Sequence, residues 1–201
     1  MRLQQLFKLT TCFIIAVTSQ TATAGVLSGP IVNPNNGNTY YLLESVPSTS
    51  VPNPFDASQA EAQSLGGNLV TVNDAAEDAW IFDTFNQAAI DASPASNRKS
   101  LLLGLSDEAI EGTFQWVSGE ALGYTNWGVG QPQAIDPDED FVGIALSNNA
   151  FIQGSKWHDI VFAAGDVVYG VVEVAVPEPT TAMLLVVSCF VVVVSRRPSR
   201  L

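Results

Sequence analysis

Oxygen-bearing side chains gather near the middle of the sequence and again near its end. Gln131 and Gln133 flank a proline, and four acids follow within residues 136–140. Amide and carboxylate oxygens suit Ca²⁺, which takes about six to eight oxygen ligands. The same composition fits a solvated acidic turn that binds nothing. The residues alone therefore leave both a calcium site and an acidic turn open.

His158 and Asp159 form the second group, and their types could serve acid–base chemistry because a carboxylate neighbour tunes an imidazole. Adjacent residues on a strand point to opposite faces, however, so the two side chains need not interact. Paired carboxylates in the acidic stretch could cleave a glycosidic bond. We expect a binding protein without catalytic residues, with a polysaccharide hydrolase as the catalytic alternative.

Composition narrows the function classes further. The chain has 201 residues and a net charge of −12, which suits one domain and argues against a surface that binds nucleic acid. The single histidine excludes a multi-histidine metal centre. The only cysteines, Cys12 and Cys189, exclude a disulfide scaffold.

Residues 1–24 have the pattern of a secretory signal peptide. Arg2 and Lys8 supply a positive start, residues 9–17 are apolar, and residues 22–24 give a small-x-small cleavage site. A buried first helix is the alternative, which the flanking charges disfavour. We expect signal peptidase to remove this segment as the protein crosses the inner membrane.

The C-terminal end carries an apolar run at residues 182–194, followed by arginines. As a helix this run would be only ~20 Å long, short of the ~30 Å hydrocarbon core of a bilayer. Pro177, Glu178 and Pro179 precede it, and residues 176–201 resemble the bacterial PEP-CTERM sorting signal. The resemblance implies recognition by an exosortase and transient anchoring in the membrane. It also implies delivery to the envelope, surface or extracellular matrix of a Gram-negative-type bacterium.

Charge is distributed unevenly along the chain. Between residues 25 and 176 there are three basic and nineteen acidic residues, so this part carries a net charge of −16. Both cysteines fall within the proposed sorting segments, and the exported domain has none. Its stability must therefore come from its apolar core.

Helix caps and apolar residues predict two helices near the start of the exported domain. Asp56 is a good N-cap, Gln59 completes a capping pair, and Gly66 ends the first helix. Asn73 or Asp74 caps the second helix.

Short β-like segments follow the helices, which indicates an α+β domain over residues 39–175 after a lead-in at residues 25–38. Residues 119–140 form a long polar stretch, and loops of that length in a compact domain are usually functional or disordered. Trp116, Trp127 and Trp157 are predicted to anchor core and loop. Strands are predicted at residues 39–43, 69–72, 101–105, 114–117, 141–146, 156–160 and 167–174.

Five motifs, in one order, resemble the C-type lectin-like domain across residues 39–175. The resemblance implies a fold with two helices, two small antiparallel sheets and a long loop region. The four cysteines that pair in this family align with Ala62, Phe141, Phe162 and Val172 of this chain, so the fold is expected to lack the family disulfides. The motifs span residues 65–80, 103–107, 112–119, 126–133 and 157–159, the last being Trp-His-Asp in place of Trp-Asn-Asp.

The resemblance also implies a ligand site. In sugar-binding members, one calcium joins the protein to carbohydrate through oxygens of the long loop and the last motif. Imidazole is a poorer calcium partner than an amide oxygen, so His158 is a departure from the pattern. The matching ligand-binding positions are Gln131, Gln133, Glu139, His158 and Asp159, and the matching calcium ligands are Gln131, Glu139, Asp140 and Asp159.

Three functions remain after this reading. The first is an exported carbohydrate-binding protein for extracellular polysaccharide or surface glycan, assisted by calcium. The second is a calcium-independent adhesion or matrix protein that uses the fold for protein contacts. The third is the polysaccharide hydrolase, and the resemblance favours the first.

Overall fold

A mixed sheet runs through the whole structure, which is a computed structural model. Its strand order is β1-β2-β8-β4-β6-β7, with β3 paired to β8 and β5 paired to β4. The structure describes residues 24–47, 49, 53–96, 98–133, 138–147, 153–163 and 166–176. Of the predicted signal peptide only Ala24 lies within these ranges, and the sorting signal at Pro177, Glu178 and Pro179 lies outside them.

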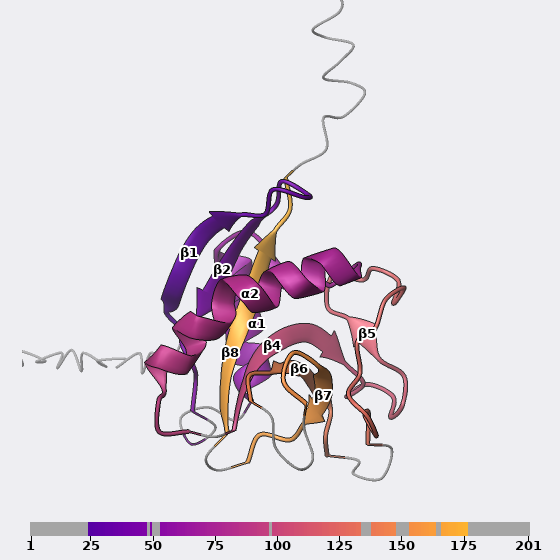
Figure 1. The fold of residues 1–201 in the computed structure, drawn as a ribbon. Coiled ribbons are helices and arrows are strands. Elements are labelled where there is room, and N and C mark those ends of the chain that lie inside the picture. The colour runs from indigo at the N-terminus through magenta and orange to yellow at the C-terminus, as the bar shows by residue number, and fades with distance from the viewer. Residues whose placement is uncertain are drawn as a thin grey trace, which may run out of the picture.

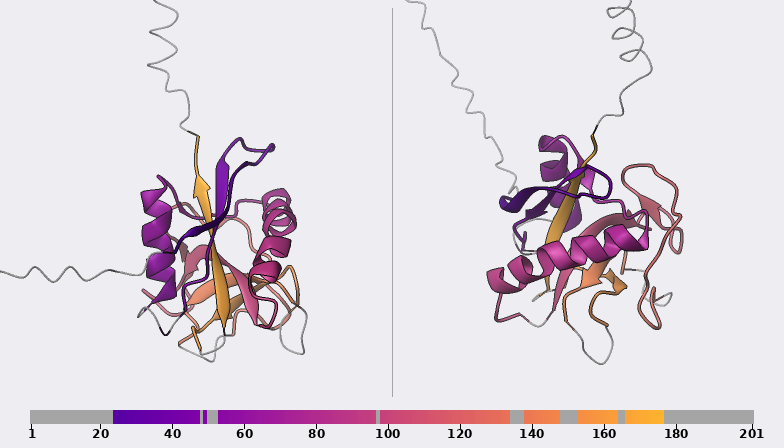
Figure 2. Two further views of the ribbon diagram at one scale, coloured as in Figure 1. Left: turned by 90° about the vertical axis from the view of Figure 1, so that its left-hand side faces the viewer. Right: turned by 45° about the horizontal axis from the view of Figure 1, so that its top comes forward.

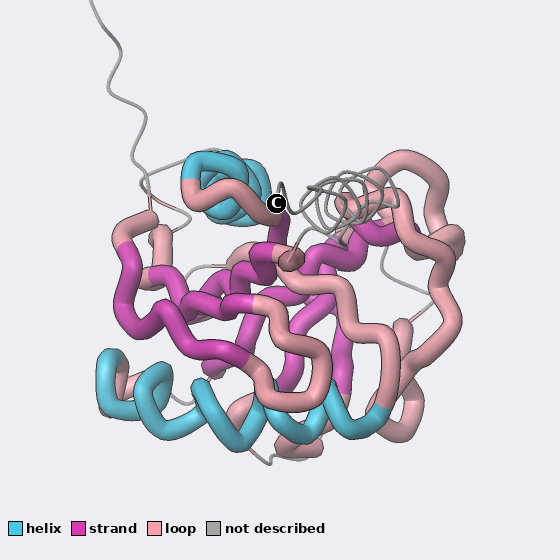
Figure 3. The backbone as a smooth tube through the Cα atoms, turned by 90° about the horizontal axis from the view of Figure 1, so that it is seen from above, coloured by secondary structure: helices cyan, strands magenta, loops and turns pink. Residues whose placement is uncertain are grey.

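The elements follow the α+β order expected from the sequence (Figure 1). The helices α1 and α2 lie on opposite sides of the sheet (Figure 2), and the view from above shows strands between them (Figure 3). In chain order the elements are β1 Val26–Val32, β2 Thr39–Leu43, α1 Pro54–Ser64, β3 Asn68–Leu69, α2 Ala75–Ala92, β4 Lys99–Ser106, β5 Gln115–Trp116, β6 Phe141–Ala145, β7 Trp157–Ile160 and β8 Val167–Val174.

The sheet differs in one respect from the two antiparallel sheets that were expected. One antiparallel group contains β1, β2, β3 and β8, and the other contains β4, β5, β6 and β7. A parallel pairing of β4 with β8 joins them into one hydrogen-bonded path. Both central strands are buried along most of their length, as their continuous apolar sequences require.

The helix boundaries show which capping predictions hold. Asp74 caps α2, and its Oδ1 accepts from the backbone N–H groups of Ala76 and Glu77 at 2.9 Å each. The prediction of Asp56 as the first cap was wrong, because Asn53 caps α1 and Pro54 occupies its first turn. Proline suits that place, since it has no N–H to leave unsatisfied.

A strand at the start of the domain was not predicted. Residues 25–38 were expected as a lead-in, but β1 pairs with β2 as an edge strand. Gly29 and Pro30 interrupt the strand pattern in the sequence. Register shifts on either side of Ser28 accommodate them. The strand predicted at 69–72 is also shorter than expected and ends at Leu69.

The four positions aligned with family cysteines are filled by apolar packing. Ala62 and Val172 are fully buried in one cluster. The rings of Phe141 and Phe162 stack with centroids 4.9 Å apart, and Phe55 stacks against Phe141 at 4.7 Å. The expectation of a fold without disulfides is confirmed for the described residues.

Among the described residues, no helix combines the length and apolar character needed to cross a membrane. The apolar run at residues 182–194 lies outside those residues.

Replacing Phe141 tests whether this aromatic stack supports the core. Phe141→Ala removes a ring that is 5% exposed and should lower the free energy of unfolding by about 3–5 kcal/mol. Phe141→Leu refills most of the volume and should cost about 1 kcal/mol. Urea unfolding of both variants measures the difference, and equal losses would contradict a role for the stack.

Candidate ligand-binding pocket

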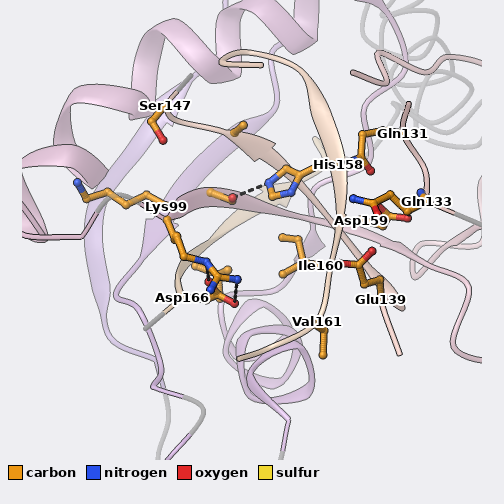
Figure 4. Close-up of a pocket in the computed structure, with 14 residues that line it drawn as sticks. Lys99, Gln131, Gln133, Glu139, Ser147, His158, Asp159, Ile160, Val161 and Asp166 are labelled. Carbon is orange, nitrogen blue, oxygen red and sulfur yellow. Dashed lines mark hydrogen bonds and ion pairs between the residues drawn. The ribbon is translucent and has the colours of Figure 1, made fainter. Parts of the chain in front are cut away.

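A pocket opens where the end of the long loop meets strands β4, β6, β7 and the start of β8 (Figure 4). All five residues predicted to bind ligand line it, and they come from two separate parts of the chain. The loop and the segment before β6 supply Gln131, Gln133 and Glu139, and β7 supplies His158 and Asp159.

Backbone pairing holds the long loop against β7. The N–H of Trp157 donates to the Asn126 carbonyl at 2.9 Å, and the N–H of Gly128 donates to the Trp157 carbonyl at 2.9 Å. Beyond this point, the N–H of Gln133 donates to Asp159 Oδ2 at 2.5 Å. The loop therefore places its two glutamines beside the β7 carboxylate.

The amide oxygen of Gln131 is the best indicator of a ligand. Gln131 Oε1 is buried and accepts no hydrogen bond from any residue that the structure describes. Leaving a buried acceptor unsatisfied costs about 1–3 kcal/mol. A ligand atom that contacts this oxygen would recover that free energy.

The pocket has the oxygen chemistry of a calcium site but few carboxylates. Glu139 Oε2 and Asp159 Oδ1 are buried oxygens in the same pocket as Gln131. Within the described ranges, no three histidine, cysteine, aspartate or glutamate side chains form a metal-binding group. Calcium would therefore need amide oxygens together with these two carboxylates.

His158 lines the pocket but faces β4. Its Nε2 lies 2.7 Å from the Oγ of Ser100, and the pair is buried (Figure 4). Burial lowers the pKa of His158 to about 4, so the imidazole is neutral at pH 7. Asp159 instead accepts from the backbone of Gln133, so the two neighbours have different partners.

Asp140 does not line the pocket, although it was predicted as a calcium ligand. Its pKa is raised by burial and by the charges of Asp107 and Asp138. It belongs to a separate acidic cluster, because the N–H of Asp107 donates to its carbonyl at 3.1 Å. Strand β6 begins immediately after Asp140, and this fixes the backbone in that position.

Asp107 is a functional candidate that sequence reasoning missed. It is buried, its Oδ2 accepts from the Gly112 N–H at 2.9 Å, and its Oδ1 accepts no hydrogen bond within the described chain. An acidic residue two positions after the apolar run at 101–105 was the available signal.

Asp78 on α2 anchors the loop and β7 together, and sequence reasoning missed it as well. Its Oδ1 accepts from Trp157 Nε1 at 2.8 Å, and its Oδ2 accepts from Asn126 Nδ2 at 2.5 Å. The hydroxyl of Tyr124 donates to the same Oδ2 at 3.3 Å. Burial raises the pKa of Asp78, although these donors oppose the shift.

Aromatic rings surround the anchored indole. The Trp157 ring meets Trp116, Tyr124 and Trp127 edge to face, with centroids 5.7–5.9 Å apart. Trp116 and Trp157 are buried, and Trp127 is partly buried. The three tryptophans therefore anchor core and loop, as predicted.

Comparisons with known proteins agree with this architecture. The sequence model described as "Lectin C-type domain" matches residues 51–160. A perlucin-like protein of Mytilus galloprovincialis is 28% identical over 102 residues, which are 50% of this chain and 58% of that protein. The chain thus spans little more than half the length of this curated relative.

Solved structures show the same fold. Human lithostathine has a TM-score of 0.54 at 21% identity, covering 72% of this chain and 96% of its own. The carbohydrate-recognition domain of cow CD23, solved in the presence of a GlcNAc2Man3 oligosaccharide, has a TM-score of 0.51 at 22% identity. That alignment covers 70% of this chain and 90% of the CD23 domain.

Asp78→Asn tests the anchor. An amide offers one acceptor oxygen, and its NH2 group would face a donor, so the free energy of unfolding should fall by about 2–3 kcal/mol. Asp83→Asn, an exposed change on the same helix, should alter stability by about 0.5 kcal/mol or less. Urea unfolding followed by tryptophan fluorescence compares them, and equal effects would contradict the anchoring role.

The buried imidazole predicts a pH dependence. The unfolded chain takes up a proton near pH 6.5, whereas folded His158 takes it up near pH 4. The contribution of His158 to the free energy of unfolding is therefore fully present above pH 6.5. About 3 kcal/mol of that free energy is lost as the pH falls from 6.5 toward 4. Urea unfolding between pH 7 and pH 4 should show a steeper loss for the native chain than for His158→Asn. Acids with raised pKa values act in the opposite direction but equally in both proteins, so parallel curves would contradict the prediction.

Proposed function

Because the chain belongs to the C-type lectin domain family, we propose that it is an exported carbohydrate-binding protein whose pocket holds a saccharide through calcium. Family members are generally non-catalytic domains that bind carbohydrate or protein. One observation carries the proposal: the buried Oε1 of Gln131, which accepts no hydrogen bond from the described residues, shares a pocket with the carboxylates of Glu139 and Asp159.

The donor set fits calcium. Gln131, Glu139 and Asp159 offer one amide and two carboxylate groups, and Gln133 offers a second amide from the same pocket. These are hard oxygens, and an ion that takes about six to eight of them keeps positions for further ligands. Calcium bound there would supply a positive centre that accepts the hydroxyl oxygens of a sugar.

His158 weakens this arrangement. Its imidazole lies against Ser100 and offers calcium no oxygen. Strand β7 therefore contributes one metal ligand, the Asp159 carboxylate, where the Trp-Asn-Asp motif of the family would contribute an amide and a carboxylate. The scarcity of clustered carboxylates favours a second candidate, in which the same pocket binds saccharide or protein without calcium. Both candidates use the pocket, and only the first requires the metal.

The proposed location at the cell envelope fits the placement of the pocket. Val168, near the start of β8, lines the pocket, and the described chain ends at Val176 beyond the other end of that strand. Eight residues of strand span about 26 Å. A C-terminal tail held in the envelope would therefore leave the end of β8 that lines the pocket on the far side of the domain.

Calcium should raise the thermal midpoint of the purified full-length protein. At a calcium concentration 100 times the dissociation constant, the gain is about 2.7 kcal/mol, or about 5–10 °C. Gln131→Ala should lose most of this gain, whereas Gln63→Ala on the exposed face of α1 should keep it. Differential scanning calorimetry makes the measurement, and a midpoint that ignores calcium would leave only the metal-free candidate.

His158→Asn should strengthen calcium binding, because it places an amide oxygen where the imidazole stands. We expect the calcium dissociation constant to fall about tenfold in isothermal titration calorimetry. Ser100→Ala removes the partner of His158 without adding an oxygen ligand and serves as the control. An unchanged dissociation constant in His158→Asn would show that position 158 does not contribute to the metal site.

A further inference from the structure

The pocket has a second end that carries positive charge and that the calcium site does not use. Arg98 and Lys99 line it, at the start of β4. We propose that the saccharide is acidic, with hydroxyl groups toward Gln131 and Asp159 and a carboxylate toward Arg98 and Lys99. This inference rests on the proposed function, since it concerns the ligand of the same pocket.

The placement of basic residues is the first support. Residues 25–176 contain three basic side chains against nineteen acidic ones, and two of the three line this pocket. The third, Lys156, hydrogen bonds through Nζ to Asn126 Oδ1 within the loop anchor. The positive charge of a strongly acidic domain is therefore concentrated around one site.

Arg98 is held in position by one ion pair and keeps further N–H donors for a ligand. Its Nε lies 2.6 Å from Asp166 Oδ1, and its Nη2 donates to Asp166 Oδ2 at 3.3 Å. This pair uses one edge of a guanidinium that has five N–H donors. The Arg98 side chain is 56% exposed, whereas that of Asp166 is 10% exposed. Asp166 therefore orients Arg98, and the rest of its planar fork remains suited to a carboxylate.

Lys99 is the second basic residue that lines this end of the pocket. Its backbone carbonyl accepts from the Leu146 N–H at 3.0 Å, which fixes the start of β4 against the end of β6. Lys99 and Asp166 lie on the opposite side of the pocket from Gln133 and Glu139 (Figure 4). A ligand that spans the pocket thus meets amide and carboxylate oxygens at one end and, at the other, Lys99 beside the Arg98–Asp166 ion pair.

The charge balance links this end to the calcium end. The lining has two basic side chains, Arg98 and Lys99, and three acidic ones, Glu139, Asp159 and Asp166. The pocket carries −1 alone and +1 with calcium. Charges of the domain that lie farther away than the Debye length, about 8 Å at physiological salt, are largely screened here. An acidic saccharide is therefore favoured once calcium is bound.

Two matched saccharides test the inference with the full-length protein in excess calcium. Digalacturonic acid and its dimethyl ester share their hydroxyl groups and differ in charge. Isothermal titration calorimetry at 0.15 M salt should show the acid binding about tenfold more tightly. Raising the salt to 1 M should reduce this preference, because the Debye length falls to about 3 Å.

Variants assign the preference to the two cations. Lys99→Gln should weaken binding of the acid about fivefold and leave the ester unchanged. Combining it with Arg98→Gln should abolish the preference. Gln63→Glu, on the exposed face of α1, changes net charge by the same single unit as Lys99→Gln and should preserve the preference. Thermal midpoints of all variants confirm that each protein is folded.

The outcomes separate this inference from the proposed function. Equal binding of acid and ester, lost in Gln131→Ala, would overturn the inference and leave the calcium-assisted site intact. Preferential binding of the acid that survives Gln131→Ala and a chelator would support the inference and overturn the calcium site. Binding of neither saccharide, in a protein whose midpoint still rises with calcium, would overturn the acidic ligand alone.

Discussion

The pocket depends on a buried carboxylate that is not part of it. Asp78 on α2 accepts hydrogen bonds from Trp157 and Asn126, and so joins the helix to the loop and to β7. Hydrogen bonds to a charged group contribute about 1.5–3 kcal/mol each, more than neutral ones. Without this anchor, nothing else described ties the start of the loop to α2 through a buried charge. The glutamines at the pocket are positioned as a consequence.

The pocket combines charges of both signs with a buried amide oxygen, Gln131 Oε1, that accepts no hydrogen bond from the described residues. Burial of Gln131 Oε1 has a cost that a cation can offset, and calcium is the ion whose ligand chemistry matches the oxygens of this pocket. The cations at the other end have no role in holding that ion. Their presence in so acidic a domain is explained by a ligand with a negative group. The acidic groups of the pocket thus serve the calcium ion, and the basic groups serve the ligand's negative charge.

Much of the fold was predictable because its signals are local. The apolar run at 101–105 and the cap at Asp74 were identified from a few neighbouring residues, and both hold in β4 and α2. Strand β1 was missed because Gly29 and Pro30 break its pattern, and only the pairing with β2 reveals it. Five pocket residues followed from the family resemblance. Asp78 could not be found, because its partners are 48 and 79 residues away along the chain.

The central claim is that Gln131 Oε1 is a calcium ligand, and side-chain NMR tests it most directly. The amide NH2 signals of Gln131 in the purified protein should shift during a calcium titration and saturate with the dissociation constant found by calorimetry. The signals of Gln63, on the exposed face of α1, should not shift. Signals of Gln131 that do not move, in a protein whose other resonances show calcium binding, would contradict the account.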